Sequence, residues 1–313
     1  MNANIPAPIS PKLGSVLCPD APSRDGSPRA MRYWLWTAPD CKSPDHVVIC
    51  VHGLTRQGRD FDALARRLSR DCTVIAVDVA GRGASDWLAD GNLYGVPLYV
   101  ADHIRLIQQI AETFSPTAID WIGTSMGGLI GMGVASLPDG VLAHRIRKLV
   151  LNDVGPTLEF EALKRIGAYV GQTARFSSLQ AGTDALWAVC SGFGPHTADE
   201  WFELSRHMLV ERGDHFEFHY DPAIARAFRG FDAPGAAEGV ARGNQALWAA
   251  YDAIRAETLV IRGEVSDLLS KETLQAMAER GPKARTVTVE SVGHAPTLVA
   301  PSQQALVADF LLI

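Results

Sequence analysis

Cysteine is scarce in this sequence and is spread along it. The 313 residues contain five cysteines, an odd number with no close pair at metal-ligand spacing: Cys18, Cys41, Cys50, Cys72 and Cys190. This pattern argues against a disulfide framework and against a cysteine-based metal site. Reduced thiols are the simpler interpretation, and they predict a cytoplasmic protein.

Long hydrophobic runs and an excess of positive charge are also missing. No stretch approaches the length that spans a bilayer, and the opening MNANIPAPISPKLGSV lacks a basic start followed by an apolar run. The 29 Lys and Arg are outnumbered by 35 Asp and Glu, which gives a formal net charge of −6. Because polyanion binding needs clustered basic residues, neither nucleic acid nor a membrane is expected as a partner.

What the sequence does have is a regular alternation of strand-like and helix-like segments. Short runs rich in β-branched residues lie at 47–51, 73–77, 118–122, 148–152, 258–262 and 286–289. Helical patterns fill the gaps at 60–70, 99–114, 126–137, 271–280 and 301–312. This alternation predicts an α/β fold with a mostly parallel, doubly wound sheet.

The alternation is interrupted in two places. Residues 1–30 are rich in Pro, Ser, Gly and Asp, and are expected to be an irregular lead-in or edge segment. Residues 155–256 hold successive helical patterns without a convincing strand, which predicts an inserted helical cap; the alternating segment 216–220 is left unassigned. The core domain is therefore expected at 31–154 and 257–313.

A candidate nucleophile stands in the segment Gly123-Thr-Ser125-Met-Gly127, between a strand-like run and a helical pattern. This strand–turn–helix context is what the G-x-S-x-G motif requires. The glycines permit a tight turn that exposes the serine hydroxyl, and the backbone N–H of Met126 is left able to donate to an oxyanion. Ser125 is accordingly predicted to be the nucleophile.

The segment His52-Gly53-Leu54 follows the first strand-like run of the core. A glycine there lets the N–H of Leu54 turn toward the serine, so Leu54 and Met126 are predicted to form the oxyanion hole. The side chain of His52 is interpreted as a buried structural histidine.

A candidate base and two candidate acids lie at the carboxyl ends of later strands. His294 sits between the last strand and the last helix, where a loop can reach back to the serine. Asp267, after the run 258–262, is the favoured acid because it completes the chain order Ser125, Asp267, His294. Asp153, at the end of the run 148–152, is the alternative.

These motifs together resemble the α/β-hydrolase superfamily, in particular small bacterial cap-bearing esterases, over residues 31–313. The loop after the second core strand is similar as well, through Gly81, Gly83, Ser85 and Asp86, and the resemblance implies that it supports the site without taking part in chemistry. In this family a helical cap follows the sixth core strand. Serine rather than aspartate at the turn disfavours dehalogenase and epoxide hydrolase chemistry.

The sequence therefore predicts a serine carboxylic-ester hydrolase that works through an acyl-enzyme, without a metal or an organic cofactor. The expected substrate is a small to medium, largely apolar ester, such as a hydroxyacid oligomer or a lactone. Cap aromatics are expected to line its pocket, with Trp187, Phe193 and Trp201 as candidates. The alternatives are a carbon–carbon bond hydrolase or lyase on the same triad and a non-catalytic ligand-binding homologue. A monomer or homodimer is expected.

Overall fold

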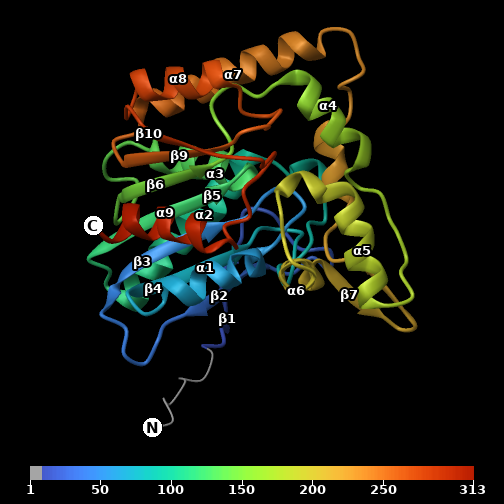
Figure 1. Cartoon of the computed structure of the whole chain (residues 1–313), viewed down its shortest axis with the longest axis horizontal. Helices are drawn as coiled ribbons and strands as arrows, with labels where there is room; N and C mark the ends of the chain where they lie inside the picture. The colour runs from blue at the N-terminus through green and yellow to red at the C-terminus, as the bar shows by residue number, and fades with distance from the viewer. Residues whose placement is uncertain (1–8) are drawn as a thin grey trace.

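The computed structural model describes residues 9–313, and its centre is an eight-stranded sheet (Figure 1). The strands lie in the order β1-β2-β4-β3-β5-β6-β9-β10. Their bounds are β1 Lys12–Cys18, β2 Arg29–Trp36, β3 Ser43–Val51, β4 Cys72–Asp78, β5 Ala118–Thr124, β6 Ile146–Asn152, β9 Glu257–Gly263 and β10 Arg285–Val289. All six predicted strand runs fall within these elements, so the predicted α/β class is confirmed.

The sheet is parallel from β4 to β10 and antiparallel at its other edge. β1 pairs with β2, and β2 with β4, in antiparallel register, whereas every later pair is parallel. Every residue of β4 is buried. A strand that is covered on both faces needs apolar residues on both, and this explains why the central runs are continuously hydrophobic rather than alternating.

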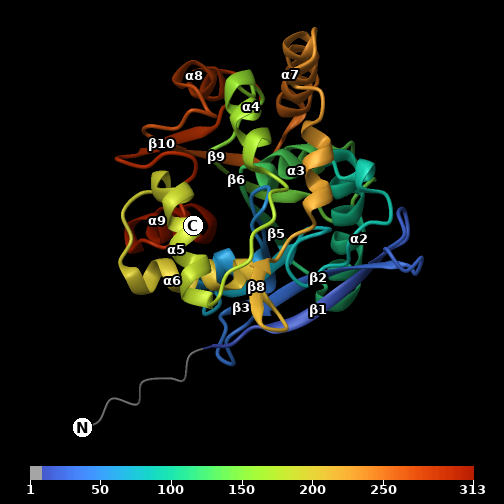
Figure 2. The same cartoon turned by 90° about the vertical axis from the view of Figure 1, so that its right-hand side faces the viewer.

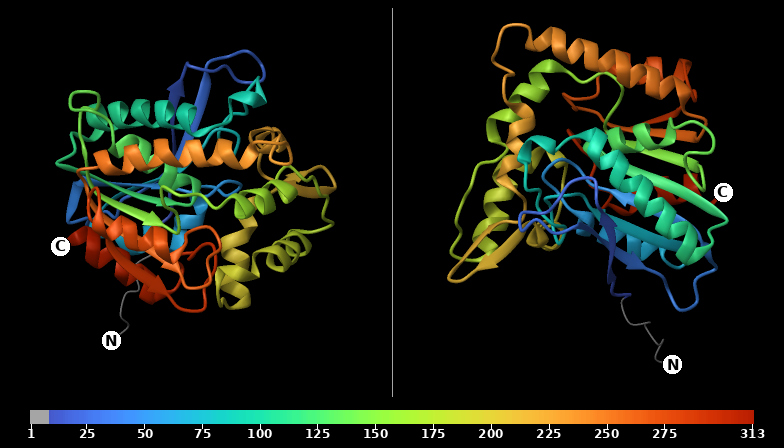
Figure 3. Two further views of the ribbon diagram at one scale, coloured as in Figure 1. Left: turned by 90° about the horizontal axis from the view of Figure 1, so that it is seen from above. Right: turned by 180° about the vertical axis from the view of Figure 1, so that it is seen from behind.

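Helices cover both faces of the sheet. α2 (Val96–Phe114), α3 (Met126–Ala135), α7 (Ala236–Ala253) and α8 (Lys271–Glu279) contribute to the larger apolar core on one face. The core on the opposite face is closed by α1 (Asp62–Leu68) and α9 (Pro301–Leu312). Figure 1 shows α1 and α9 in front of the sheet, and the view from behind in Figure 3 shows α2 on the other side.

Part of the predicted lead-in forms an edge strand of the sheet. Residues 12–18 form β1, which pairs along its whole length with β2, from Lys12 opposite Leu35 to Cys18 opposite Arg29. β1 is an edge strand with one exposed face, so it carries no continuous apolar run that would have indicated a strand. The first eight residues of the lead-in lie outside the described part of the chain.

The chain between β6 and β9, residues 153–256, is called the inserted segment. It carries a helical layer that stands at one end of the sheet (Figure 2). Its elements are α4 Phe160–Tyr169, α5 Leu179–Cys190, η3 Ser191–Phe193, α6 Ala198–Ser205, η4 Arg206–Met208, β7 Leu209–Arg212, β8 His215–Phe218 and η5 Pro222–Phe228. The unassigned stretch 216–220 largely belongs to β8, which pairs antiparallel with β7. A short hairpin therefore accompanies the helices.

α7 is part of the same inserted sequence but lies on the core. It packs beside α3, and the hydroxyl of Tyr251 donates to the carbonyl of Met277 on α8 over 2.7 Å. α7 is thus the crossover helix that leads back into β9. Helical periodicity does not distinguish a crossover from a cap helix, and the proposed division at residues 155 and 256 stays a prediction.

No helix in residues 9–313 has both the length and the apolar character needed to cross a membrane.

Candidate active site

Ser125 stands at a sharp turn between β5 and α3. Its backbone has a positive φ of 53°, a region that a non-glycine residue rarely adopts. The glycines on either side are required by close backbone approach: a Cβ on Gly123 would lie 2.3 Å from the carbonyl oxygen of Gly127, and one on Gly127 would lie 2.0 Å from that of Val51. The turn holds the serine side chain at the carboxyl edge of the sheet.

Ser125, His294 and Asp153 form one hydrogen-bonded chain. Nε2 of His294 lies 2.8 Å from Oγ of Ser125, and its Nδ1 lies 2.7 Å from Oδ2 of Asp153. Because a carboxylate only accepts, Nδ1 carries the hydrogen and donates to Asp153, which leaves Nε2 to accept from the serine hydroxyl. This is the tautomer that can remove a proton from Ser125.

Asp153 is fully buried, and further donors hold its carboxylate in place. The backbone N–H of Gly263 donates to Oδ1 over 2.8 Å, and the hydroxyl of Ser266 donates to Oδ2 over 2.7 Å. Both donors belong to β9 or the loop after it, because β6 and β9 are neighbours in the sheet. With His294 as the third donor, both oxygens of the buried carboxylate have partners.

The structure places the alternative acid, Asp153, beside His294 and the favoured acid, Asp267, elsewhere. Asp267 makes a two-pronged ion pair with Arg165 of α4, at 2.8 and 2.9 Å, and its side chain is half exposed. It directly follows Ser266, whose hydroxyl contacts Asp153. The loop after β9 therefore reaches the triad through Ser266, while Asp267 turns outward to the inserted helices.

The two residues predicted to form the oxyanion hole are linked behind the site by one arginine. Met126 is the first residue of α3, so its N–H is among those with no acceptor within the helix. Arg82 is fully buried and donates from Nε to the carbonyl of Leu54 over 2.8 Å, while its Nη2 lies 3.5 Å from Sδ of Met126. Arg82 thereby fixes the backbone of one residue and the side chain of the other.

His52 has a structural place, as expected from its strand-end position. The N–H of Val79 donates to its Nε2 over 3.0 Å, so Nδ1 carries the hydrogen and donates to the carbonyl of Gly53 over 2.7 Å. Burial lowers the pKa of His52 to about 3, which keeps the ring neutral. His52 ties the turn that carries Leu54 to the end of β4.

The three cap aromatics predicted to bind substrate lie in one small cluster. Trp201 is buried and donates its indole N–H to the carbonyl of Thr183, whereas Trp187 is 37% exposed and packs edge-on against Trp201. Phe193 lies closer to the core, with its ring centroid 5.8 Å from Cζ of Arg56. Their role toward a substrate stays a prediction.

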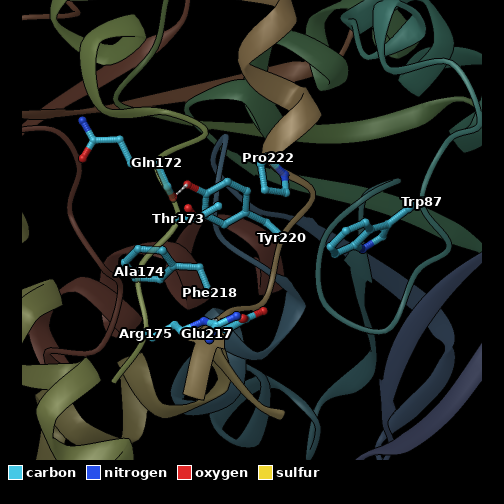
Figure 4. Close-up of a pocket in the computed structure, with 9 residues that line it drawn as sticks. All are labelled: Trp87, Gln172, Thr173, Ala174, Arg175, Glu217, Phe218, Tyr220 and Pro222. Atoms are coloured by element: carbon cyan, nitrogen blue, oxygen red, sulfur yellow. Dashed lines mark hydrogen bonds and ion pairs between the residues drawn. The ribbon is translucent and has the colours of Figure 1, made fainter. Parts of the chain in front are cut away.

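A cavity of about 430 Å³ lies where the inserted segment meets the core (Figure 4). Its lining includes Trp87 from the loop after β4, Arg175 from the inserted segment, and Phe218 and Tyr220 from β8 and the turn after it. Tyr220 also forms an isolated antiparallel bridge with Arg82. Tyr220 therefore connects the cavity to Arg82, the arginine that contacts Leu54 and Met126.

Comparison with known proteins identifies the family. Residues 48–310 match the sequence profile of the Alpha/beta hydrolase family. The chain belongs to this family. The hydrolase is 45% identical to the 3-hydroxybutyrate-oligomer hydrolase of Cupriavidus necator over 305 residues, which cover 96% of this chain and 98% of that protein. The predicted family and the predicted hydrolase class are confirmed.

Solved structures agree with this assignment. An alpha/beta hydrolase from Novosphingobium aromaticivorans is 32% identical, with a TM-score of 0.77 and coverage of 97% of this chain and 98% of that one. The structure of a protein from Rickettsia typhi superimposes with a TM-score of 0.80 at 24% identity, covering 96% of this chain and 98% of that one, and supports the fold.

Sequence reasoning missed three residues that hold the hydrolase site together. Ser266 secures Asp153, and Arg82 secures the turn of Leu54. The side-chain amide of Asn152 donates to the hydroxyl of Thr124 and to the carbonyl of Pro296. Its main-chain carbonyl accepts from the N–H of Ser125. Each of the three contacts a residue that is distant in sequence, so a local pattern does not reveal its role. Arg82 is the exception, because it stands between Gly81 and Gly83 in a loop that the sequence already marked.

Proposed function

We propose that this chain hydrolyses the ester bonds of short 3-hydroxybutyrate oligomers through an acyl-enzyme on Ser125. The ester-hydrolase class follows from the family and from the 45% identical relative, whose match covers nearly the whole of both chains. The relative's name supports the substrate. The observation that carries the mechanism is the unbroken hydrogen-bonded chain from Ser125 through His294 to Asp153.

In the proposed reaction, Nε2 of His294 takes the hydroxyl proton of Ser125 while Oγ attacks the ester carbonyl. The N–H groups of Leu54 and Met126 hold the oxyanion of the tetrahedral intermediate. Asp153 orients the imidazole and stabilises its charged form, as the acid of a serine triad does. His294 then gives its proton to the 3-hydroxyl oxygen of the leaving unit, and water releases the acyl group by the same route.

The substrate would lie between the core and the inserted segment. The triad comes entirely from the core, and the inserted segment supplies aromatic side chains and part of the nearby cavity. A hydroxybutyrate oligomer combines methyl groups with ester oxygens, so a cavity lined by both aromatic and polar side chains suits it. Cytoplasmic location and a monomeric or dimeric state stay predictions; all five cysteines are unpaired thiols, which fits the former.

The test is direct turnover of defined oligomers. The purified chain should release 3-hydroxybutyrate from the dimer and trimer, and Ser125→Ala should abolish the release. A nitrophenyl ester of butyrate serves as the general ester substrate, and a β-diketone reports carbon–carbon bond cleavage. Turnover of the β-diketone alone would replace the ester proposal, and binding of oligomers without turnover would indicate a non-catalytic homologue.

A further inference from the structure

The backbone of Arg56 lies close to Ser125, the proposed nucleophile. It follows the oxyanion turn of Gly53 and Leu54, and its N–H donates to the carbonyl of Gly53 over 3.2 Å. The point where a Cβ on Gly53 would stand is 3.6 Å from Cβ of Ser125 and 3.8 Å from Cγ of Arg56. The side chain of Arg56 therefore leaves the backbone on the same side of the turn as Ser125.

The guanidinium of Arg56 lies where the core meets the inserted segment. Its Nη2 donates to the carbonyl of Leu204 over 3.1 Å, and its Cζ lies 5.8 Å from the ring centroid of Phe193. The neighbouring carbonyl of Gly192 accepts from the N–H of Gly293, the residue before His294. The guanidinium is thus bounded by the oxyanion turn on one side and by the turn that touches the His294 loop on the other.

One nitrogen of this buried guanidinium has no partner. Nε and Nη2 both donate to Asp60, at 2.6 and 2.9 Å, whereas Nη1 is buried and has no hydrogen-bond acceptor among residues 9–313. Arg56 as a whole is 8% exposed. A buried charged donor without an acceptor costs free energy, and an acceptor oxygen from a ligand would remove that cost.

The neighbouring arginine, Arg59, differs from Arg56 in this respect, although Nη1 of Arg29 and Nε of Arg206 are also buried without a hydrogen-bond partner among the described residues. Arg59 makes the same two-pronged contact with Asp62, at 2.7 and 2.6 Å, and is also mostly buried. None of its nitrogens is a buried donor without a partner in the described part of the chain. The two pairs lie on the same short segment, which makes Arg59 a matched control.

The chemistry of Nη1 selects the kind of atom that it takes. A guanidinium nitrogen only donates, so its ligand must accept. Asp60 already balances the charge of Arg56, so a carbonyl oxygen is accommodated as readily as a carboxylate. In a 3-hydroxybutyrate dimer the scissile carbonyl faces the oxyanion hole, and the remaining carbonyl-type oxygens are those on C1 of the leaving unit; in a longer oligomer that C1 oxygen is an ester carbonyl.

We infer that Arg56 is a specificity-determining residue whose Nη1 donates to a C1 oxygen of the leaving hydroxybutyrate unit. This inference rests on the proposed function. It assigns Arg56 to substrate recognition rather than to bond cleavage, so its contribution depends on whether the substrate carries that oxygen.

The experiment compares two esters that differ only at this point. In sec-butyl 3-hydroxybutyrate, a methyl group replaces the C1 carboxylate of the dimer. Arg56→Lys keeps a positive charge beside Asp60 but removes the forked nitrogen. We expect its kcat/KM to fall about 10-fold to 100-fold more for the dimer than for the sec-butyl ester, the range expected for one hydrogen bond to a charged group. Arg59→Lys should change the ratio of the two by less than about threefold.

Each outcome separates the two proposals. Equal losses of Arg56→Lys on both esters, or no loss on either, would overturn the role of Arg56 and leave the proposed function standing. A wild-type chain that cleaves the sec-butyl ester but not the dimer would overturn both. If Arg56→Lys does not fold, the wild type decides by itself: a dimer to sec-butyl ester ratio near one contradicts the inference, and a ratio above about ten supports it.

Discussion

Asp153 and Asp267 differ in the side chains that contact their carboxylates. Both follow neighbouring parallel strands, β6 and β9, so both reach the same edge of the sheet. The difference is made by contacts across the sheet: Ser266 and Gly263 donate to Asp153, while Arg165 takes Asp267. Ser125 and His294 could be predicted because a local motif marks the first and chain order marks the second; no local pattern marks which of two strand ends faces the imidazole.

Asp153→Asn should therefore lower kcat by about 10⁴ at neutral pH. Asparagine keeps the shape but loses the charge that holds the tautomer of His294 and stabilises the imidazolium. Asp267→Asn should change kcat by less than about threefold, because it breaks an exposed ion pair only. Both values come from steady-state hydrolysis of a nitrophenyl ester, with thermal unfolding to verify that each variant is folded. A larger loss at Asp267 would reverse the assignment.

Removal of the nucleophile should stop chemistry without disturbing the fold. Ser125→Ala is expected to lower kcat by about 10⁴ to 10⁶ and to leave the substrate Kd nearly unchanged, because the oxyanion donors and the pocket remain. Labelling by a fluorophosphonate should disappear with the hydroxyl. Persistent labelling or undiminished turnover in this variant would show that another residue is acylated.

At the scale of elements, the parallel strands were predictable and the inserted segment was less so. Buried parallel strands are recognisable in sequence as short runs rich in β-branched residues, and all six predicted runs lie in strands. β1 and the β7–β8 hairpin are short or half-exposed, so their residues carry no comparable signal. α7 has the periodicity of any amphipathic helix, and only its packing on α3 assigns it to the core.

The aromatic cluster of the inserted segment should be more important for stability than for catalysis. Trp201 packs with Leu186, Leu204 and Met208 in a small apolar core of its own. Trp201→Ala should lower the free energy of unfolding by about 3–5 kcal/mol, whereas the half-exposed Trp187→Ala should cost less than half as much. Urea unfolding of both variants measures this difference.

The same two variants should keep the chemistry. Neither tryptophan can transfer a proton, so kcat on a small nitrophenyl ester should stay within about fivefold of wild type while selectivity among oligomer lengths changes. Loss of Trp187 that destabilises the chain as much as loss of Trp201 would contradict the cluster as described.

At the scale of the whole molecule, buried histidines should make the fold acid-sensitive. Burial lowers the pKa of His52 to about 3 and that of His103 to about 4. In the unfolded chain both titrate near 6.5, so as pH falls the unfolded state takes up protons first, and stability present above pH 6.5 is lost toward pH 4. Asp78 opposes this trend: burial raises its pKa to about 6, so its protonation between pH 6 and 4 favours the folded state.

The histidines should dominate, because burial also lowers the pKa of His207, to about 4, and that of His219. Asp60 and Asp102, whose pKa values burial raises, act in the same direction as Asp78. We expect the free energy of unfolding to fall between pH 6.5 and 5, with each histidine contributing up to about 2 kcal/mol.

His103 packs on Trp121 and makes no hydrogen bond to Ser125, His294 or Asp153, and among residues 9–313 its Nε2 has no partner. His103→Phe should reduce the pH dependence by its share, as measured by urea unfolding at the two pH values. An unchanged slope would mean that His103 does not titrate in this range.

The contacts that the inserted segment makes nearest the site have a consequence for how such enzymes diversify. Gly192 and Leu204 reach the His294 loop and Arg56 through main-chain carbonyls, and a further backbone pairing joins His219 to Gly83. Amino-acid replacement leaves a main-chain carbonyl in place. The sequence of this segment can therefore drift widely between lineages while its docking onto the core persists, so a new substrate range can evolve, or be grafted as a chimera, with the inherited triad left untouched.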